Sequence, residues 1–119
     1  MKMEFVAFIG KDKENWGQIL TIIKRMNPEK AILVKNSEIK DFPEGNYDII
    51  NVNSSKPLIE LKEEIITKLR KYLSTEFEVA LSLASGNGKE HMALIASLIN
   101  IPVGIKLVVF TQNGLDFIT

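Results

Sequence analysis

Short apolar runs alternate with amphipathic segments along this chain, and that alternation limits its fold more than any other feature. The β-prone runs predict buried strands at residues 4–9, 31–34, 47–52, 77–83 and 104–110. Strands that alternate with helices require right-handed crossovers, which produce a mostly parallel sheet with helices on both faces. The sequence therefore predicts a three-layer, Rossmann-like α/β domain with about six strands, spanning residues 1–119 as one unit.

Three segments have the pattern of helices. The first carries apolar residues at three- and four-residue steps over residues 16–26, with Asp12 as its expected N-cap. The second begins at Pro57 and buries one apolar stripe. The third, residues 92–99, is apolar almost all round, which predicts a helix buried on more than one side. After the last parallel strand, residues 112–114 read Gln-Asn-Gly and predict a hairpin that ends the chain on an antiparallel strand.

Composition and charge argue against several classes of function. The chain has 15 basic and 15 acidic side chains, so no overall field attracts duplex nucleic acid or an anionic membrane. With no cysteine and a single histidine, neither a disulfide framework nor a classical zinc site can form within one chain, and we expect no metal and no cofactor. No apolar stretch approaches membrane-spanning length, and the N-terminus lacks a secretory signal pattern, so we expect a cytoplasmic protein.

Polar loops follow four of the predicted strands. In open α/β sheets, ligands bind at the carboxyl ends of the strands, near the point where strand order reverses. These loops offer amides, hydroxyls and lysines but no pair of carboxylates, which suits recognition of phosphates and bases better than metal-assisted or carboxylate chemistry. The candidate ligand-binding residues are Gly10, Lys11, Asp12 and Lys13 after the first strand, Asn36 and Ser37 after the second, Asn53 and Ser54 after the third, and Ser85, Gly86, Asn87, Gly88 and Lys89 after the fourth.

The segment after the fourth strand is the strongest of these candidates. Its two glycines let backbone N–H groups approach a phosphate, the first turn of the next helix leaves its N–H groups unpaired, and Lys89 adds a full charge. A plain helix-entry turn with an exposed lysine is the alternative. The segment is not a Walker motif, because Leu83 and Glu90 stand where that motif needs glycine and a hydroxyl. Nor does Gly10, alone after the first strand, make a dinucleotide fingerprint.

The order of elements, the terminal hairpin and the junction Ser85-Gly86-Asn87-Gly88-Lys89, followed by Met92 and an apolar helix, resemble the CRISPR-associated Rossmann fold domain, usually called CARF. The signature of that family is Ser or Thr, a glycine pair, a small residue and Lys or Arg, with Met shortly after. Asn87 separates the two glycines in this chain, which departs from the usual pattern. The resemblance covers nearly the whole chain, and the motif is short and moderately specific.

The resemblance implies a homodimeric receptor for cyclic oligoadenylate, the ring-shaped RNA second messenger of type III CRISPR defence. A tetra- or hexa-adenylate ring has even-fold symmetry, so two copies of one site related by a dyad can grip it. Residues 85–89 match the family's ligand loop, and residues 10–13 match the loop that faces the bound ring. The apolar helix over residues 92–99 can pack across that dyad. Duplex nucleic acid and membranes are not expected partners.

Some members of the family cut the ring, so the resemblance also raises metal-independent ring nuclease activity. In that reaction a ribose 2′-hydroxyl attacks its neighbouring phosphorus, and the developing charge needs stabilisation. Lys89 is the candidate for charge stabilisation, Ser85, Lys11 or Lys13 for assistance, and His91 for acid or base catalysis. The alternative function is that of a noncatalytic Rossmann-like regulatory or interaction domain, such as the ligand-sensing part of a transcription regulator, that binds another nucleotide or metabolite.

Overall fold

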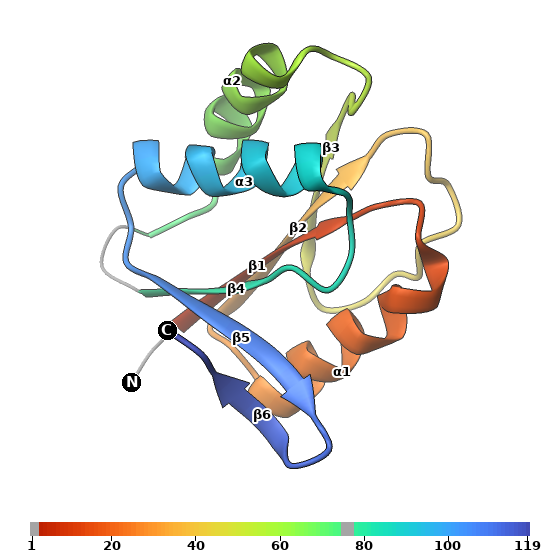
Figure 1. Cartoon of the computed structure of the whole chain (residues 1–119), viewed down its shortest axis with the longest axis vertical. Coiled ribbons are helices and arrows are strands. Elements are labelled where there is room, and N and C mark those ends of the chain that lie inside the picture. The colour runs from red at the N-terminus through yellow and green to blue at the C-terminus, as the bar shows by residue number, and fades with distance from the viewer. Residues whose placement is uncertain (1–2, 75–77) are drawn as a thin grey trace.

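A computed structural model describes residues 3–74 and 78–119, and Figure 1 shows them as a central sheet with helices on both faces. The strands are β1 (Met3–Ile9), β2 (Lys30–Asn36), β3 (Asp48–Val52), β4 (Glu78–Ser82), β5 (Ile105–Thr111) and β6 (Gly114–Phe117). They form one six-stranded sheet in the order β3-β2-β1-β4-β5-β6. The first five are parallel, and β6 pairs antiparallel with β5. The predicted α/β fold class is confirmed.

Each face of the sheet has its own hydrophobic cluster. The helices are α1 (Trp16–Met26), which a single 3-10 turn at Lys13–Asn15 precedes, α2 (Leu58–Leu69) and α3 (Gly88–Asn100). Because successive strand residues point to opposite faces, Phe5 packs with the buried side of α1, whereas Val6 packs with α2 and α3. Helices α2 and α3 lie side by side on their face (Figure 1). The result is the three-layer arrangement that the alternating pattern predicted.

The second and fourth strands differ from their predicted bounds. We predicted the second strand for residues 31–34, but β2 continues through Lys35 and Asn36, which pair with Asn51 and Val52 of β3. Both residues are buried, because the end of β2 lies between β1 and β3. Lys35 also pairs with Ile9 of β1, and this strand pairing outweighs the polar character that marked the stretch as a loop. The fourth strand was predicted to begin at Phe77, which lies outside the described residues; β4 begins at Glu78.

Helix α3 is buried on one side rather than on several. Its inward residues, Ala93, Leu94 and Leu98, are fully buried in the cluster that α3 shares with α2 and the sheet. On the opposite side, Met92 and Ile99 are 59% and 62% exposed. The prediction that residues 92–99 form a helix buried on more than one side is therefore wrong for this chain on its own. The sheet and α2 cover one stripe, and the apolar residues left over face outward.

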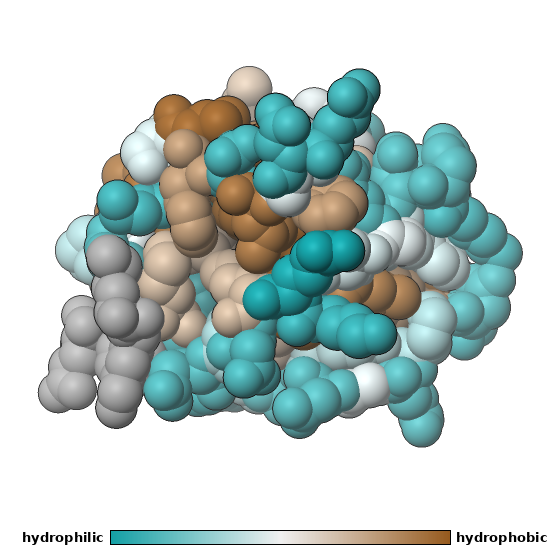
Figure 2. Space-filling view, turned by 90° about the horizontal axis from the view of Figure 1, so that it is seen from below, coloured by the Kyte–Doolittle hydropathy of each residue, from teal (hydrophilic) through white to brown (hydrophobic). Residues whose placement is uncertain are grey.

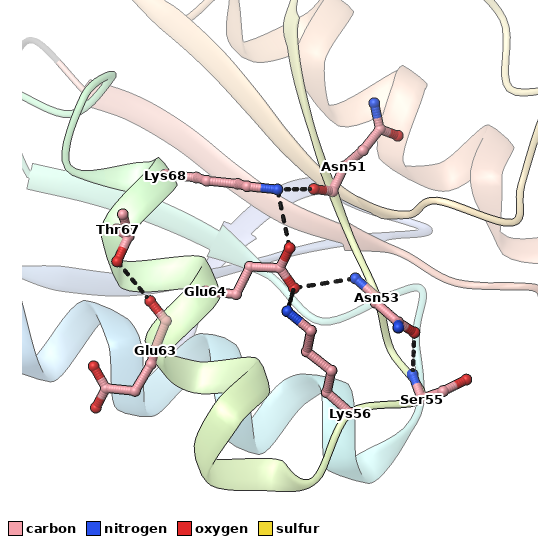
Figure 3. Close-up of polar contacts among 8 residues, drawn as sticks. All are labelled: Asn51, Asn53, Ser55, Lys56, Glu63, Glu64, Thr67 and Lys68. Atoms are coloured by element: carbon pink, nitrogen blue, oxygen red, sulfur yellow. Dashed lines mark hydrogen bonds and ion pairs between the residues drawn. The ribbon is translucent and has the colours of Figure 1, made fainter.

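The partly buried carboxylate of Glu64 connects α2 to the loop after β3 (Figure 3). Glu64 accepts hydrogen bonds from Lys68 at 3.0 Å and from the Asn53 backbone N–H at 3.2 Å, and it pairs with Lys56 at 3.4 Å. Burial acts to raise the pKa of Glu64, but these hydrogen bonds and charges outweigh it and hold the pKa below its ordinary value. The charged Glu64 thus fixes the loop at residues 53–56, which carries two of the predicted ligand residues.

The chain ends in the predicted hairpin. Thr111 pairs with Gly114, and Gly114 has a φ of +104°, a conformation that favours glycine over other residues. On the face that carries this hairpin, apolar side chains gather between hydrophilic ones (Figure 2), and Phe117 and Ile118 are among the exposed apolar residues. None of the helices in the described part of the chain is both long and apolar enough to span a membrane.

Candidate functional site

The loops that follow β1 and β4 are joined by buried polar contacts. Strand order reverses between these two strands, because β2 and β3 lie on one side of β1 and β4 lies on the other. The Ser85 hydroxyl donates to Asp12 Oδ1 at 2.7 Å and accepts from the Gly10 N–H at 3.0 Å. The Gly86 N–H also donates to Asp12 Oδ1, at 3.0 Å. We call this set of contacts among Gly10, Asp12, Ser85 and Gly86 the loop clasp.

Asp12 does not cap a helix as predicted. The α-helix begins only at Trp16, and Asp12, which precedes the 3-10 turn, makes no side-chain cap bond there. Its carboxylate instead accepts from Ser85, Gly86 and Asn15 Nδ2, the last at 2.7 Å. Burial acts to raise the pKa of Asp12, but these hydrogen bonds outweigh it and the pKa lies below its ordinary value. The clasp therefore holds an ionised carboxylate at neutral pH.

A cleft of about 320 Å³ opens beside the clasp at the carboxyl edge of the sheet. The loops after β1, β3 and β4 and the end of β2 meet in it, as expected for a switch point in strand order. Its lining consists of Lys11, Asp12, Asn36, Ser54, Ser55, Gly86, Asn87 and Glu90. Six of the predicted ligand residues are among these, and Ser55 and Glu90 are additions. The expectation that the site lacks two carboxylates is wrong, because Asp12 and Glu90 both line it.

Glu90 is the residue that sequence reasoning missed. It is 3% exposed, its Oε1 accepts from the Asn87 N–H at 2.9 Å, and its Oε2 accepts from the Ser54 hydroxyl at 2.7 Å. Asn87 Oδ1 in turn accepts from the Glu90 N–H at 2.8 Å, which completes a capping box at the start of α3. The spacing Asn87-x-x-Glu90 is the sequence signal for such a box. The capping box also explains why Asn87 replaces a glycine, because it uses the Asn87 side chain. The φ of Asn87, −107°, is ordinary extended backbone and does not require glycine.

The amides of the glycine loop are only partly open. The Gly86 N–H donates to Asp12, and the capping box occupies the two N–H groups on either side of the helix start. Among the described residues, the N–H groups of Gly88 and Lys89 have no hydrogen-bond partner. The expectation that the first turn of α3 leaves its N–H groups unpaired holds for Gly88 and Lys89 but not for Glu90, so two amides at that turn remain for an anion. Gly86 has a φ of +103°, a conformation that favours glycine over other residues. A Cβ added to Gly88 would meet nothing within 4 Å, so packing does not require glycine at that position.

The three catalytic candidates lie in different environments. Ser85 is fully buried, and its hydroxyl is used within the clasp. His91 is half-buried, and its Nε2 lies 2.7 Å from the Ser85 carbonyl oxygen, to which it donates. Lys89 is exposed at the rim, where its ammonium donates to the Ser54 carbonyl oxygen at 2.8 Å. In this conformation Ser85 and His91 hold the loop, and Lys89 is the candidate that faces solvent.

Of the remaining candidates, Lys11 lines the cleft and the others lie around it. Lys11 pairs with Glu38 at 2.8 Å, and that hydrogen bond and charge raise the pKa of Lys11. Lys13 pairs with Asp41, Ser37 donates its N–H to the Val52 carbonyl oxygen, and Asn53 accepts from the Ser55 N–H. Lys13, Ser37 and Asn53 do not line the cleft. Nowhere in residues 3–74 and 78–119 do three or more His, Asp or Glu side chains gather as a metal site requires.

Comparison with known proteins supports the fold. No protein-family model matches the sequence, and no curated protein matches it. In structure, the chain is similar to Enterococcus italicus Csm6 bound to cyclic hexa-2′-fluoro-hexa-dAMP, with a TM-score of 0.61 and 17% sequence identity. The match covers 94% of this chain and 34% of that one, so the chain spans about a third of the length of the protein it matches. The chain therefore has the CARF-like Rossmann fold that its element order and glycine loop predicted.

Proposed function

We propose that residues 1–119 act as one cytoplasmic receptor domain for cyclic oligoadenylate, in type III CRISPR defence. The observation that carries the proposal is the cleft at the strand-order switch point, where the loops after β1, β3 and β4 converge with the end of β2. The fold around that cleft is shared with a Csm6 that was solved bound to a cyclic hexa-dAMP analogue. At this identity the likeness supports the fold, and the ligand is our proposal.

Phosphate capture is assigned to the first turn of α3. The free N–H groups of Gly88 and Lys89 belong to the first turn, the positive end, of a 13-residue helix, and the Lys89 side chain adds a full positive charge. Gly88 has no side chain that could obstruct these N–H groups. The neighbouring residues leave room for a side chain at position 88, so packing is not the reason for glycine there. The clasp and the capping box use up the other amides, so a phosphate contacts the loop at these two residues and not along its whole length.

We propose a homodimer because one cleft is too small for the ring. A volume of about 320 Å³ is at the lower end for a ligand pocket and suits a single nucleotide of the ring. Met92 lies one turn after Lys89, and together with Ile99 it forms an exposed apolar stripe along α3. A second copy packed on this stripe buries it and brings a second cleft to the same ring. A ring of four or six adenylates has even-fold symmetry, so it can lie on the twofold axis of such a dimer.

Binding is proposed ahead of cleavage. A ring nuclease needs groups that reach the reacting 2′-hydroxyl or its phosphorus. Ser85 and His91, two of the three candidates for that role, are engaged with each other and with the clasp. Lys89 alone is exposed and able to stabilise charge on a bound phosphate. Metal-independent cleavage is therefore an outcome to test rather than part of the proposal.

Calorimetry with cyclic tetra-adenylate and cyclic hexa-adenylate tests the proposal. We expect micromolar or tighter binding of one ring, with about one ring per two chains. Replacing Lys89 by Ala removes a charge-assisted contact and lowers the affinity by about tenfold or more. The matched control is Lys71→Ala, an exposed lysine after the C-terminal end of α2, at the opposite end of that helix from the loop at residues 53–56. Its affinity should equal that of the wild type.

Chromatography of the incubated ring separates a receptor from an enzyme. An intact ring after long incubation supports a receptor or a sink, whereas linear products that disappear with Lys89→Ala reveal a ring nuclease. No binding of either ring at micromolar concentration overturns the proposal. If linear mononucleotides or dinucleotides then bind in the same cleft, the chain is a regulatory domain for another nucleotide.

A further inference from the structure

Asn36 lines the cleft from the end of β2. Ile32 and Val34 of the same strand belong to the cluster under α2 and α3, so alternation directs Asn36 to that face. Asn36 is 6% exposed, and it lines the cleft together with Ser54 and Glu90. The extension of β2 beyond its predicted end is what gives this amide a buried and fixed position.

The Asn36 amide is used on one side and free on the other. Its Oδ1 accepts a hydrogen bond from the Glu38 N–H at 3.2 Å. Its Nδ2 has no hydrogen-bond partner among the described residues and is not sealed from solvent. The Glu38 N–H sets the orientation of the amide, because a flipped amide would place two donors against each other. A ligand acceptor that enters the cleft can therefore take the place of water at this donor.

We propose that Asn36 reads the base of a bound adenylate. Its Nδ2 donates to a ring nitrogen, and the second lone pair of Oδ1 accepts from the exocyclic amino group, the bidentate pattern by which asparagine recognises adenine. A hypoxanthine base carries a carbonyl oxygen in place of that amino group, so at the same edge it sets an acceptor against Oδ1. This inference rests on the proposed function and adds to it the residue that selects adenine.

The test compares rings that differ only at the base edge. Cyclic hexa-adenylate and cyclic hexa-inosinate have the same backbone charge, so phosphate capture treats them alike. We expect the wild type to bind the adenylate ring about tenfold to a hundredfold more tightly. Asn36→Asp keeps an acceptor for the Glu38 N–H but replaces the donor with a carboxylate oxygen. We expect this variant to lose the preference and to bind the adenylate ring at least about tenfold more weakly.

Two controls separate base reading from charge and from misfolding. Asn51→Asp makes the same change on the neighbouring strand β3, where the side chain is exposed and, in Figure 3, points away from the other side chains drawn. It should keep the preference. Asn36→Ser carries no added charge, and its hydroxyl can still accept from the Glu38 N–H, so it should lose the preference as Asn36→Asp does. Thermal unfolding of each variant checks that it is folded.

The failures of the two proposals are distinguishable. A wild type that binds both rings equally, or an Asn36→Ser variant that is folded and keeps the preference, overturns the role of Asn36 and leaves the proposed receptor function standing. A wild type that binds neither ring overturns the receptor function, and the role of Asn36 falls with it.

Discussion

The Ser85 hydroxyl lies 2.7 Å from Asp12 Oδ1, and this contact joins two loops that are 73 residues apart in the sequence. Ser85 also accepts from the Gly10 N–H, so one buried hydroxyl serves a donor and an acceptor on the opposite loop. The contact forms at the switch point of the sheet, beside the cleft. Ser85 therefore shapes the proposed site by holding its walls together, and the charged partner that makes this hold strong is Asp12.

Removing either partner of the clasp should destabilise the fold. Asp12→Ala leaves the Ser85 hydroxyl and the Gly86 N–H without their acceptor. Ser85→Ala removes the hydroxyl oxygen that accepts from the Gly10 N–H. We expect each to lower the free energy of unfolding by about 1–3 kcal/mol, as for hydrogen bonds to charged groups. Urea denaturation of both variants and of the double variant measures this. A double variant whose loss equals the sum of the single losses would show that the two residues act independently.

The clasp should also contribute to acid unfolding. The folded-state pKa of Asp12 lies below its unfolded value, so the unfolded chain takes up a proton first as the pH falls. The stability that Asp12 contributes is thus fully present above the unfolded value of about 4 and is lost as the pH falls through the folded value. We expect the free energy of unfolding of Asp12→Asn to be lower than that of the wild type near neutral pH, with the difference shrinking below about pH 4.

Denaturant titrations at several pH values measure that difference. Glu38, Asp41 and Glu64 also have lowered pKa values, but they are present in both proteins and cancel in the comparison. A difference that stays constant down to the lowest pH would contradict an ionised Asp12 in the clasp.

Gly10 should tolerate no side chain. A Cβ at this position would lie 2.7 Å from the Gly86 Cα and 2.9 Å from Asp12 Oδ1, so the two loops would have to separate. We expect Gly10→Ala to cost at least about 1–3 kcal/mol of stability. Gly17→Ala is the matched control, since its Cβ meets nothing within 4 Å and alanine favours the helix α1 by up to about 1 kcal/mol. Opposite shifts in melting temperature are the expected result, and a stable Gly10→Ala protein would argue against the close approach.

The apolar stripe of α3 should mediate the proposed dimer. A glutamate in place of Met92 introduces a charge that would be buried against its copy, so we expect Met92→Glu to be monomeric at concentrations where the wild type is dimeric. Ile118 is 61% exposed, close to the 59% of Met92, but it belongs to the C-terminal segment after β6. Ile118→Glu is therefore the control, and it should stay dimeric. Sedimentation analysis decides, and a wild type that is monomeric at every concentration rules out the dimer.

Much of the architecture follows from local pattern. The alternation of strands with helices led to the three-layer α/β domain, and Gln112-Asn113-Gly114 led to the hairpin, because side-chain periodicity and turn chemistry act between near neighbours in the chain. The capping box of Asn87 and Glu90 is equally local and was open to prediction from its spacing. The burial of Glu90 against Ser54 was not, since the partner comes from a loop 36 residues away.

The sequence by itself determined the element types, the polar loops and the glycine turn at residues 85–89. Only the tertiary structure decided that Asp12 turns from its own helix to Ser85, and that Asn36 is held in a strand with one side of its amide free. The physical reason is that hydrogen-bond partners across a sheet depend on which strands are neighbours. The order that puts β1 beside β4 results from packing the whole chain, and no short segment specifies it.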